Sequence, residues 1–133
     1  MGASVLNTLT ELRTQVKDVL TTAGLKASDY VPETISPPIA LVIPAEPYVT
    51  LGEGRNPFGH YSVGIHVLLI GPKGTNKTAA EKVDSMILDT MSALEDWEIT
   101  EVTQPGEVVL KGIAYMGSVV TLTQNIKLIK EVI

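Results

Sequence analysis

The ten residues Tyr61–Ile70, YSVGIHVLLI, decide the fold because they form the clearest strand pattern in the chain. Large apolar side chains occupy alternate positions, which places them on one face of an extended segment. These positions are Tyr61, Val63, Ile65, Val67 and Leu69. The remaining positions mix small, polar and apolar side chains: Ser62, Gly64, His66, Leu68 and Ile70. We therefore expect one face of this strand to lie in the core and the mixed face to meet another subunit.

Helical patterns lie on both sides of this strand. Downstream, Thr78 and Glu81 can form a capping box, and apolar side chains follow at helical spacing to about residue 96. Upstream, residues 4–23 carry apolar side chains three and four positions apart, which predicts an amphipathic helix. Gly24 is suited to end that helix in a left-handed conformation.

The segment between the first helix and the strand contains most of the prolines. Residues 25–38 form a connector, and Ile39–Ile43 is a short apolar strand closed by Pro44 and Pro47. A strand bounded by prolines is better placed at a sheet edge than at its centre. Residues 50–60 are a long, Gly-rich loop, of the kind that is usually functional or mobile.

The region after the second helix is strand-like. We expect strands near Trp97–Val102, at Glu107–Tyr115 and at Gly117–Ile129, with a turn at Pro105 and Gly106. The coarse order is α-β-β-α-β-β. The predicted fold class is α+β, with a largely antiparallel sheet of about four strands and two helices packed on one face. We expect residues 1–133 to form a single domain.

Composition excludes several classes of protein. The chain has 133 residues and no cysteine, so disulfide scaffolds, thiolate zinc sites and cysteine nucleophiles are excluded. Its net charge of −5 argues against a basic face that wraps nucleic acid. No secretory signal is visible, and the most apolar stretch, Val63–Ile70, is too short to span a bilayer. We expect a soluble, intracellular protein.

The motifs that suggest chemistry are weak. Gly71–Thr78 resembles a phosphate-binding loop, but Asn76 stands where the second glycine belongs. His60 and His66 are about 20 Å apart along an extended segment, too far to share a metal ion. No G-x-S-x-G nucleophile elbow occurs. We therefore expect no enzyme activity, no catalytic residue, no metal site and no cofactor.

An acidic region extends over residues 81–107, where eight carboxylates are offset only by Lys82. It can be a solvated helix face and strand end. It can also be a surface that repels DNA phosphates and lets DNA pass.

Several segments together resemble the tail terminator and head–tail connector (neck) proteins of long-tailed bacteriophages of the siphophage type. The first helix leads through Asp29–Pro32 to the string Pro37–Pro44, and Pro47–Val49 opens the long loop. The strand Tyr61–Ile70 then runs into a helix that begins near Lys77. A late Gly112–Tyr115 string enters the final long strand. The resemblance covers nearly the whole chain.

The resemblance implies a viral structural protein that acts in tail assembly. Such proteins form a ring, commonly a homohexamer, on the last ring of the tail tube. The ring stops tube polymerisation and offers a docking surface to the neck or head-completion protein. Genomic DNA passes through its lumen without specific binding, and neither a membrane nor a cofactor is involved. The implied location is the tail–head junction of the virion, after synthesis in the host cytoplasm.

We expect the loop at residues 50–60 to contact the tail tube and the neck, with Arg55 and Phe58 as anchors, because arginine and aromatic side chains carry most interface energy. The predicted partner-binding residues are Glu53, Arg55, Asn56, Phe58, His60 and Lys73. Two alternatives stay open. The chain can be a neck adaptor or tail-tube protein of the same virion, or a small cytosolic ligand-binding protein or enzyme.

Overall fold

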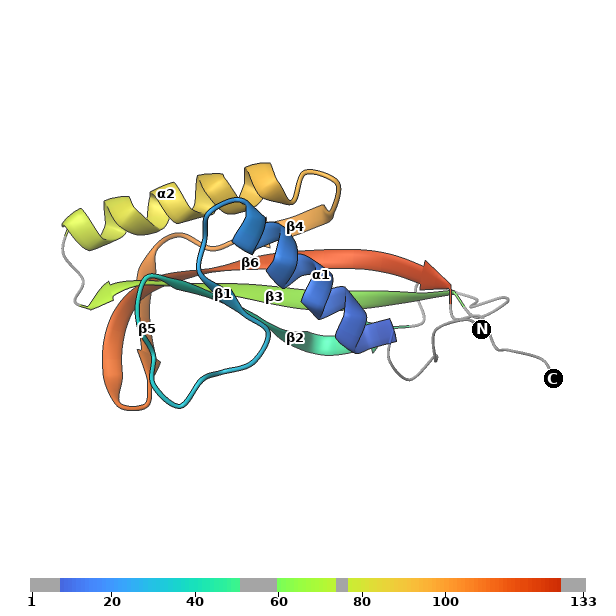
Figure 1. Ribbon diagram of the computed structural model, residues 1–133, viewed down its shortest axis with the longest axis horizontal. Coiled ribbons are helices and arrows are strands. Elements are labelled where there is room, and N and C mark those ends of the chain that lie inside the picture. The colour runs from blue at the N-terminus through green and yellow to red at the C-terminus, as the bar shows by residue number, and fades with distance from the viewer. Residues whose placement is uncertain (1–7, 51–59, 74–76, 128–133) are drawn as a thin grey trace.

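The computed structural model describes residues 8–50, 60–73 and 77–127 (Figure 1). Within these ranges the chain forms two helices and six strands. In chain order they are α1 (Thr8–Thr22), β1 (Ala27–Ser28), β2 (Ile39–Thr50), β3 (His60–Lys73), α2 (Lys77–Ala93), β4 (Glu98–Val102), β5 (Gly106–Leu110) and β6 (Ile113–Lys127).

All six strands belong to one mixed sheet. The strand order is β1-β2-β3-β6-β4, and β5 pairs with the first part of β6. β1 runs parallel to β2, whereas the other pairs are antiparallel. The prediction of a largely antiparallel sheet of about four strands, with two helices on one face, is therefore wrong. The described part of the chain has more strands, a parallel pair at one end and additional cover on the second face of the sheet.

Local features explain why the strands differ from the prediction in length and in number. β2 does not end at Ile43 but continues through Pro44 and Pro47, because a proline is tolerated where its missing N–H points away from the sheet. Lys111 and Gly112 have φ angles of 51° and 79°, and this two-residue turn separates β5 from β6. β1 has only two residues, too few to produce any alternation in the sequence.

The main core lies between the helices and one face of the sheet. The predicted apolar face of β3 is confirmed for Val63, Ile65, Val67 and Leu69, which are fully buried. The other core side chains come from both helices and from two neighbouring strands (Figure 1): Leu12, Val16 and Leu20 of α1, Met86 of α2, Ala40 and Val42 of β2, and Val120 and Leu122 of β6. Leu94, just after α2, completes this cluster.

The end of α1 follows the expected glycine rule. Gly24 has a φ of +96°, a conformation that costs little without a Cβ atom. Its N–H donates to the carbonyl of Thr21, and the N–H of Leu25 donates to the carbonyl of Leu20. This pair of bonds is a Schellman motif, which satisfies carbonyls left over at the helix end.

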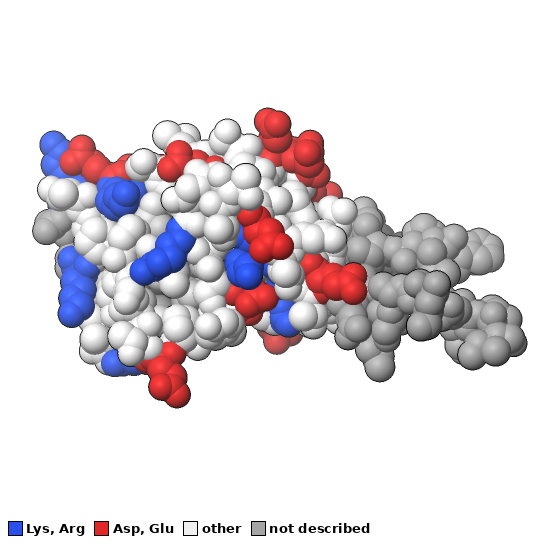
Figure 2. Space-filling model, viewed as in Figure 1, with Lys and Arg blue, Asp and Glu red and all other residues white. Residues whose placement is uncertain are grey.

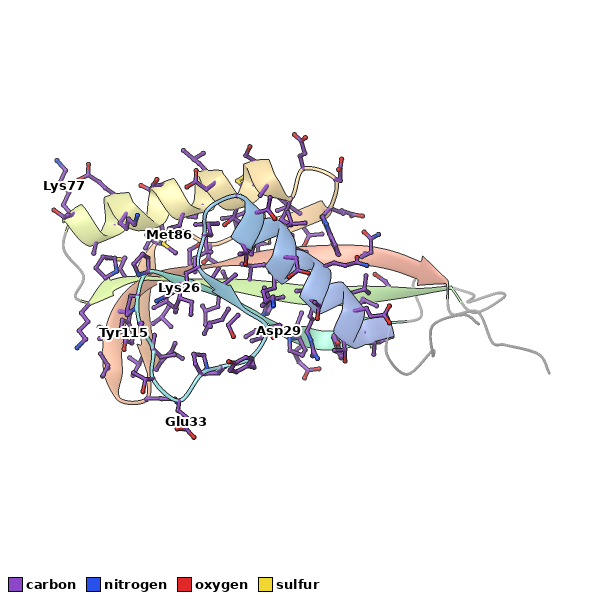
Figure 3. The ribbon with its side chains drawn as sticks, in the orientation of Figure 1. Lys26, Asp29, Glu33, Lys77, Met86 and Tyr115 are labelled. Carbon is purple, nitrogen blue, oxygen red and sulfur yellow. The ribbon has the colours of Figure 1, made fainter. Side chains whose placement is uncertain are left out.

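The second face of the sheet is covered over only one half. There a smaller buried cluster contains Ile39 and Leu41 of β2, Ile70 of β3 and Tyr115 of β6. Ile35 of the connector and Val108 and Leu110 of β5 pack against it. Figure 3 shows Tyr115 at this end of the sheet, beside the hairpin formed by β5 and β6. The connector and hairpin thus form a partial third layer. Neither α1 nor α2 is both long and apolar enough to cross a lipid bilayer.

Candidate interaction surface

Of the six residues predicted to bind partners, two lie in the described part of the chain, His60 and Lys73. Glu53, Arg55, Asn56 and Phe58 lie outside the described residues. His60 is the first residue of β3 and pairs with Lys127, whereas Lys73 is its last residue and pairs with Tyr115. They are thirteen positions apart, which is about 40 Å of extended strand. His60 and Lys73 thus lie at opposite ends of β3, and their role in partner binding stays a prediction.

A hollow on the uncovered half of the sheet is the best-defined candidate surface. It has a volume of about 270 Å³ and is built from four strands. Its lining residues are Ala45 and Glu46 of β2, Ser62, Gly64 and His66 of β3, Glu101 of β4, and Thr121 and Thr123 of β6.

Strand register brings these side chains together. His66 lies opposite Thr121, and Gly64 lies opposite Thr123, so neighbouring pairs share one face of the sheet. β4 pairs with the other edge of β6, and there Glu101 also lies opposite Thr121. The small side chains form the floor, because glycine, serine and threonine leave space above the strands. His66 and the two glutamates are larger and stand around this floor.

The change from apolar to polar along β3 explains why this half is bare. Ile70 and Leu68 lie opposite Ile39 and Leu41 of β2, and the connector and hairpin cover them. Further back along the strand, the same face carries His66, Gly64 and Ser62, which can remain hydrated. The polar half therefore loses no stability when it faces water or a polar partner.

The chemistry of the hollow is that of an anionic, hydrogen-bonding surface. Glu46 and Glu101 are exposed, and Ser62, Thr121 and Thr123 offer hydroxyl groups that can donate or accept. Such a set suits a positively charged side chain of a partner. Among residues 8–50, 60–73 and 77–127, no three His, Asp or Glu side chains are grouped closely enough to hold a metal ion.

A contact between α1 and β2 holds the end of β2 in place. The predicted interface loop begins directly after this end. The guanidinium carbon of Arg13 on α1 lies 5.8 Å from the centre of the Tyr48 ring, within cation–π range. The Nε atom of Arg13 and the hydroxyl of Tyr48 are buried and have no hydrogen-bond partner among the described residues. This contact fixes the end of β2 beneath α1.

Two other hollows lie along the helices. One, of about 400 Å³, follows Thr10, Glu11, Thr14 and Gln15 on α1. The other, of about 380 Å³, is a mainly apolar groove between Val19 of α1, Ala23 just after that helix and Ala93 of α2, with further walls from Asp18 and Thr22. Neither gathers charged groups from several strands as the sheet hollow does.

Sequence reasoning found part of the sheet surface and missed the rest. The mixed face of residues 61–70 predicts contact with another subunit, and Ser62, Gly64 and His66 of that face line the hollow. Glu46 was missed because β2 extends past Pro44. Glu101 was missed because only the register between β4 and β6 brings it to this face.

Comparison with known proteins gives no family for this sequence. No protein-family model matches it, and no curated protein matches it significantly.

Proposed function

We propose that this chain is a structural protein of the virion, placed at the tail–head junction of a long-tailed bacteriophage. Six copies form a closed ring on the last ring of the tail tube. The ring ends tube polymerisation and provides the docking surface for the neck or head-completion protein. Binding surfaces and geometry carry out this role, and no bond-making step is involved.

The observation that carries the proposal is the run of segments from the first helix to the final long strand that resembles the tail terminator and connector proteins. The half-covered sheet gives independent support. Its polar half, with a hollow of about 270 Å³, has no cover among the described residues. A subunit of a ring needs at least two such surfaces for its neighbours, because head-to-tail contacts join different patches.

Charge also suits a ring through which DNA passes. At −5 per chain, six copies carry about −30 in total. Where acidic residues line a lumen, they repel DNA phosphates and prevent sticking. Strong retention of duplex DNA by the purified protein at physiological salt would contradict this part of the proposal.

Removal of the protein from the phage that encodes it tests the role directly. Electron microscopy should show tails of uncontrolled length with no heads attached, because nothing then ends the tube or binds the neck. A complementing copy of the gene should restore normal particles. Tails of normal length joined to heads would overturn the proposal.

Native mass measurements separate this role from its neighbours. A terminator stops at a closed ring, both alone and on purified tail-tube protein. A tail-tube subunit instead polymerises without limit, and a neck adaptor binds the head side but leaves tube growth unchanged. Either of those results would reject the terminator role, as would turnover of a small metabolite by a monomer.

A further inference from the structure

Three exposed lysines gather where β3 ends and α2 begins. Lys73 is the last residue of β3, Lys77 is the first residue of α2, and Lys82 lies on the next turns of that helix. Figure 2 shows Lys and Arg side chains gathered toward this end of the molecule, and Figure 3 shows Lys77 projecting from it. We call these three residues the lysine cluster.

No carboxylate in the described part of the chain forms an ion pair with the lysine cluster, although the chain is acidic. Among the described residues the one ion pair within 4 Å joins Lys17 and Asp18, at 3.6 Å. Glu81 stands four positions after Lys77, the spacing of a helical ion pair, yet no ion pair forms there.

Helix electrostatics do not account for these lysines either. The N-terminus of a helix carries partial positive charge, so a cation there is unfavourable. α2 nevertheless begins with Lys77, has no acidic residue in its first turn and has no basic residue in its last turn. Lys77 therefore weakens α2 slightly, and the fold of the described residues gives no reason for a cation at this position.

The complementary surface lies at the other end of the sheet. Glu46, Glu98 and Glu101 are exposed; Glu46 and Glu101 line the hollow, and Glu98 lies opposite Thr123, another residue of its lining. We call these three residues the glutamate rim. His66, in the hollow, is seven positions before Lys73, which is about 23 Å of strand. The two surfaces of one copy are thus too far apart to pair with each other.

We propose that the lysine cluster of one copy docks on the glutamate rim of the next, with lysine side chains entering the hollow. This contact rests on the proposed ring and specifies how its subunits are joined. Copies of net charge −5 repel one another, so an assembly is favoured where opposite charges meet. Because the two surfaces are different and widely separated, each copy uses both, and the contact repeats head to tail.

Docking through side chains also agrees with the edges of the sheet. β1 covers β2 only at Ala40 and Leu41, so the outer edge of β2 is unpaired beyond them among the described residues. Pro44 and Pro47 lie on that edge and offer no N–H group, which hinders pairing with a strand from another copy. Adjacent copies therefore meet through charged side chains rather than through a continuous sheet.

A two-variant charge exchange tests the contact in the full chain. Lys73→Glu/Lys77→Glu makes both surfaces acidic, and Glu98→Lys/Glu101→Lys makes both basic. Each variant alone should lose self-association on the order of 100-fold relative to the original chain, because like charges then face each other. An equimolar mixture should assemble again, with the two variants alternating in rings of even copy number. Native mass spectrometry with isotope-labelled chains measures both the size and the alternation.

A matched control reverses charges away from both surfaces. Glu11→Lys/Asp18→Lys, at two exposed positions of α1, changes the net charge as much as the basic variant does, and should leave self-association within a few-fold of the original. Rising salt should weaken assembly of the original chain and of the mixture alike, because the contact is electrostatic.

Three outcomes would overturn the contact. They are an original chain that stays monomeric at high concentration in low salt, a mixture that does not assemble, and a closed dimer in place of a ring. If the mixture of the two variants assembles, the contact is supported. If tails that lack the protein also look normal, that second result rejects the phage role and leaves the contact standing. Conversely, normal particles built from a variant that cannot self-associate would reject the contact and leave the tail role standing.

Discussion

The ammonium group of Lys111 lies 2.7 Å from the carbonyl oxygen of Pro32, almost eighty positions earlier in the chain. Lys111 also donates a hydrogen bond to the neighbouring carbonyl of Glu33. It stands at the tip of the hairpin between β5 and β6, whereas both acceptors belong to the connector after β1. One side chain therefore holds together the two segments that cover half of the second sheet face.

Replacement of this lysine should loosen that cover. We expect Lys111→Met to lower the free energy of unfolding by about 1–2 kcal/mol, because two hydrogen bonds to a charged donor are lost. Methionine has the same φ preference as lysine, so backbone strain is unchanged. Urea unfolding measures the effect, with Lys26→Met, another exposed lysine that lies just before β1, as the control. Equal effects of the two changes would show that the bonds to the connector contribute nothing.

Gly117 should tolerate a side chain less well than Gly112. A Cβ atom on Gly117 would lie 2.8 Å from both the Leu69 carbonyl oxygen and the Val108 side chain. Gly112 has open space around it but a φ of +79°. We expect Gly117→Ala to lower the free energy of unfolding by about 2–3 kcal/mol and Gly112→Ala by about 1 kcal/mol. Thermal denaturation gives the order, and the reverse order would mean that β5 does not press on β6 at this point.

Two threonines should respond oppositely to the same substitution. The hydroxyl of Thr90 is fully buried in α2 without a hydrogen-bond partner among the described residues. Thr103 accepts a hydrogen bond from the N–H of Val119 at 2.9 Å and lies 3.3 Å from the Ser118 hydroxyl.

Thr90→Val should therefore be neutral or stabilising by up to about 1 kcal/mol, whereas Thr103→Val should destabilise by about 1–2 kcal/mol. Urea midpoints of the two variants, measured side by side, check the prediction. A clear loss of stability in Thr90→Val would indicate that its hydroxyl has a partner.

The interface loop provides a prediction about assembly rather than stability. Arg55→Ala/Phe58→Ala should leave the melting temperature within about 1 °C, because we expect this loop to bind partners and not to fill the core. Attachment to tail-tube or neck protein should fall strongly in pull-down and particle assays. The control, Lys26→Ala/Tyr30→Ala, removes one cation and one aromatic ring from exposed positions elsewhere. Particles that assemble normally with the loop variant would contradict the assignment of these anchors.

Local patterns predicted the elements whose causes are local. The apolar face of β3 follows from alternation, and the end of α1 follows from Gly24. The two-residue β1 and the passage of β2 through Pro44 depend on pairing between distant segments, which leaves no periodic signal. The cover on the second sheet face depends on Lys111 reaching Pro32, a contact that no short window of sequence contains.

The candidate site was predictable to a similar extent. The mixed face of residues 61–70 indicated a surface for contact, and three of its residues line the hollow. Which carboxylates join them depends on strand register, and register is set by the whole sheet rather than by residues near Glu46 or Glu101. His60 and Lys73 lie at the two ends of β3, so a whole strand separates them.

The position of β6 has a consequence for folding during translation. β6 pairs with β3, β4 and β5, yet of all six strands it is the last to leave the ribosome. Until residues 113–127 emerge from the exit tunnel, the inner edge of β3 has no neighbour, and Val63, Ile65 and Val67 have no completed core. Before this strand is translated, the nascent chain is therefore a partly folded intermediate that exposes an unpaired strand edge and apolar side chains. This is the stage of synthesis at which the chain is most prone to aggregate.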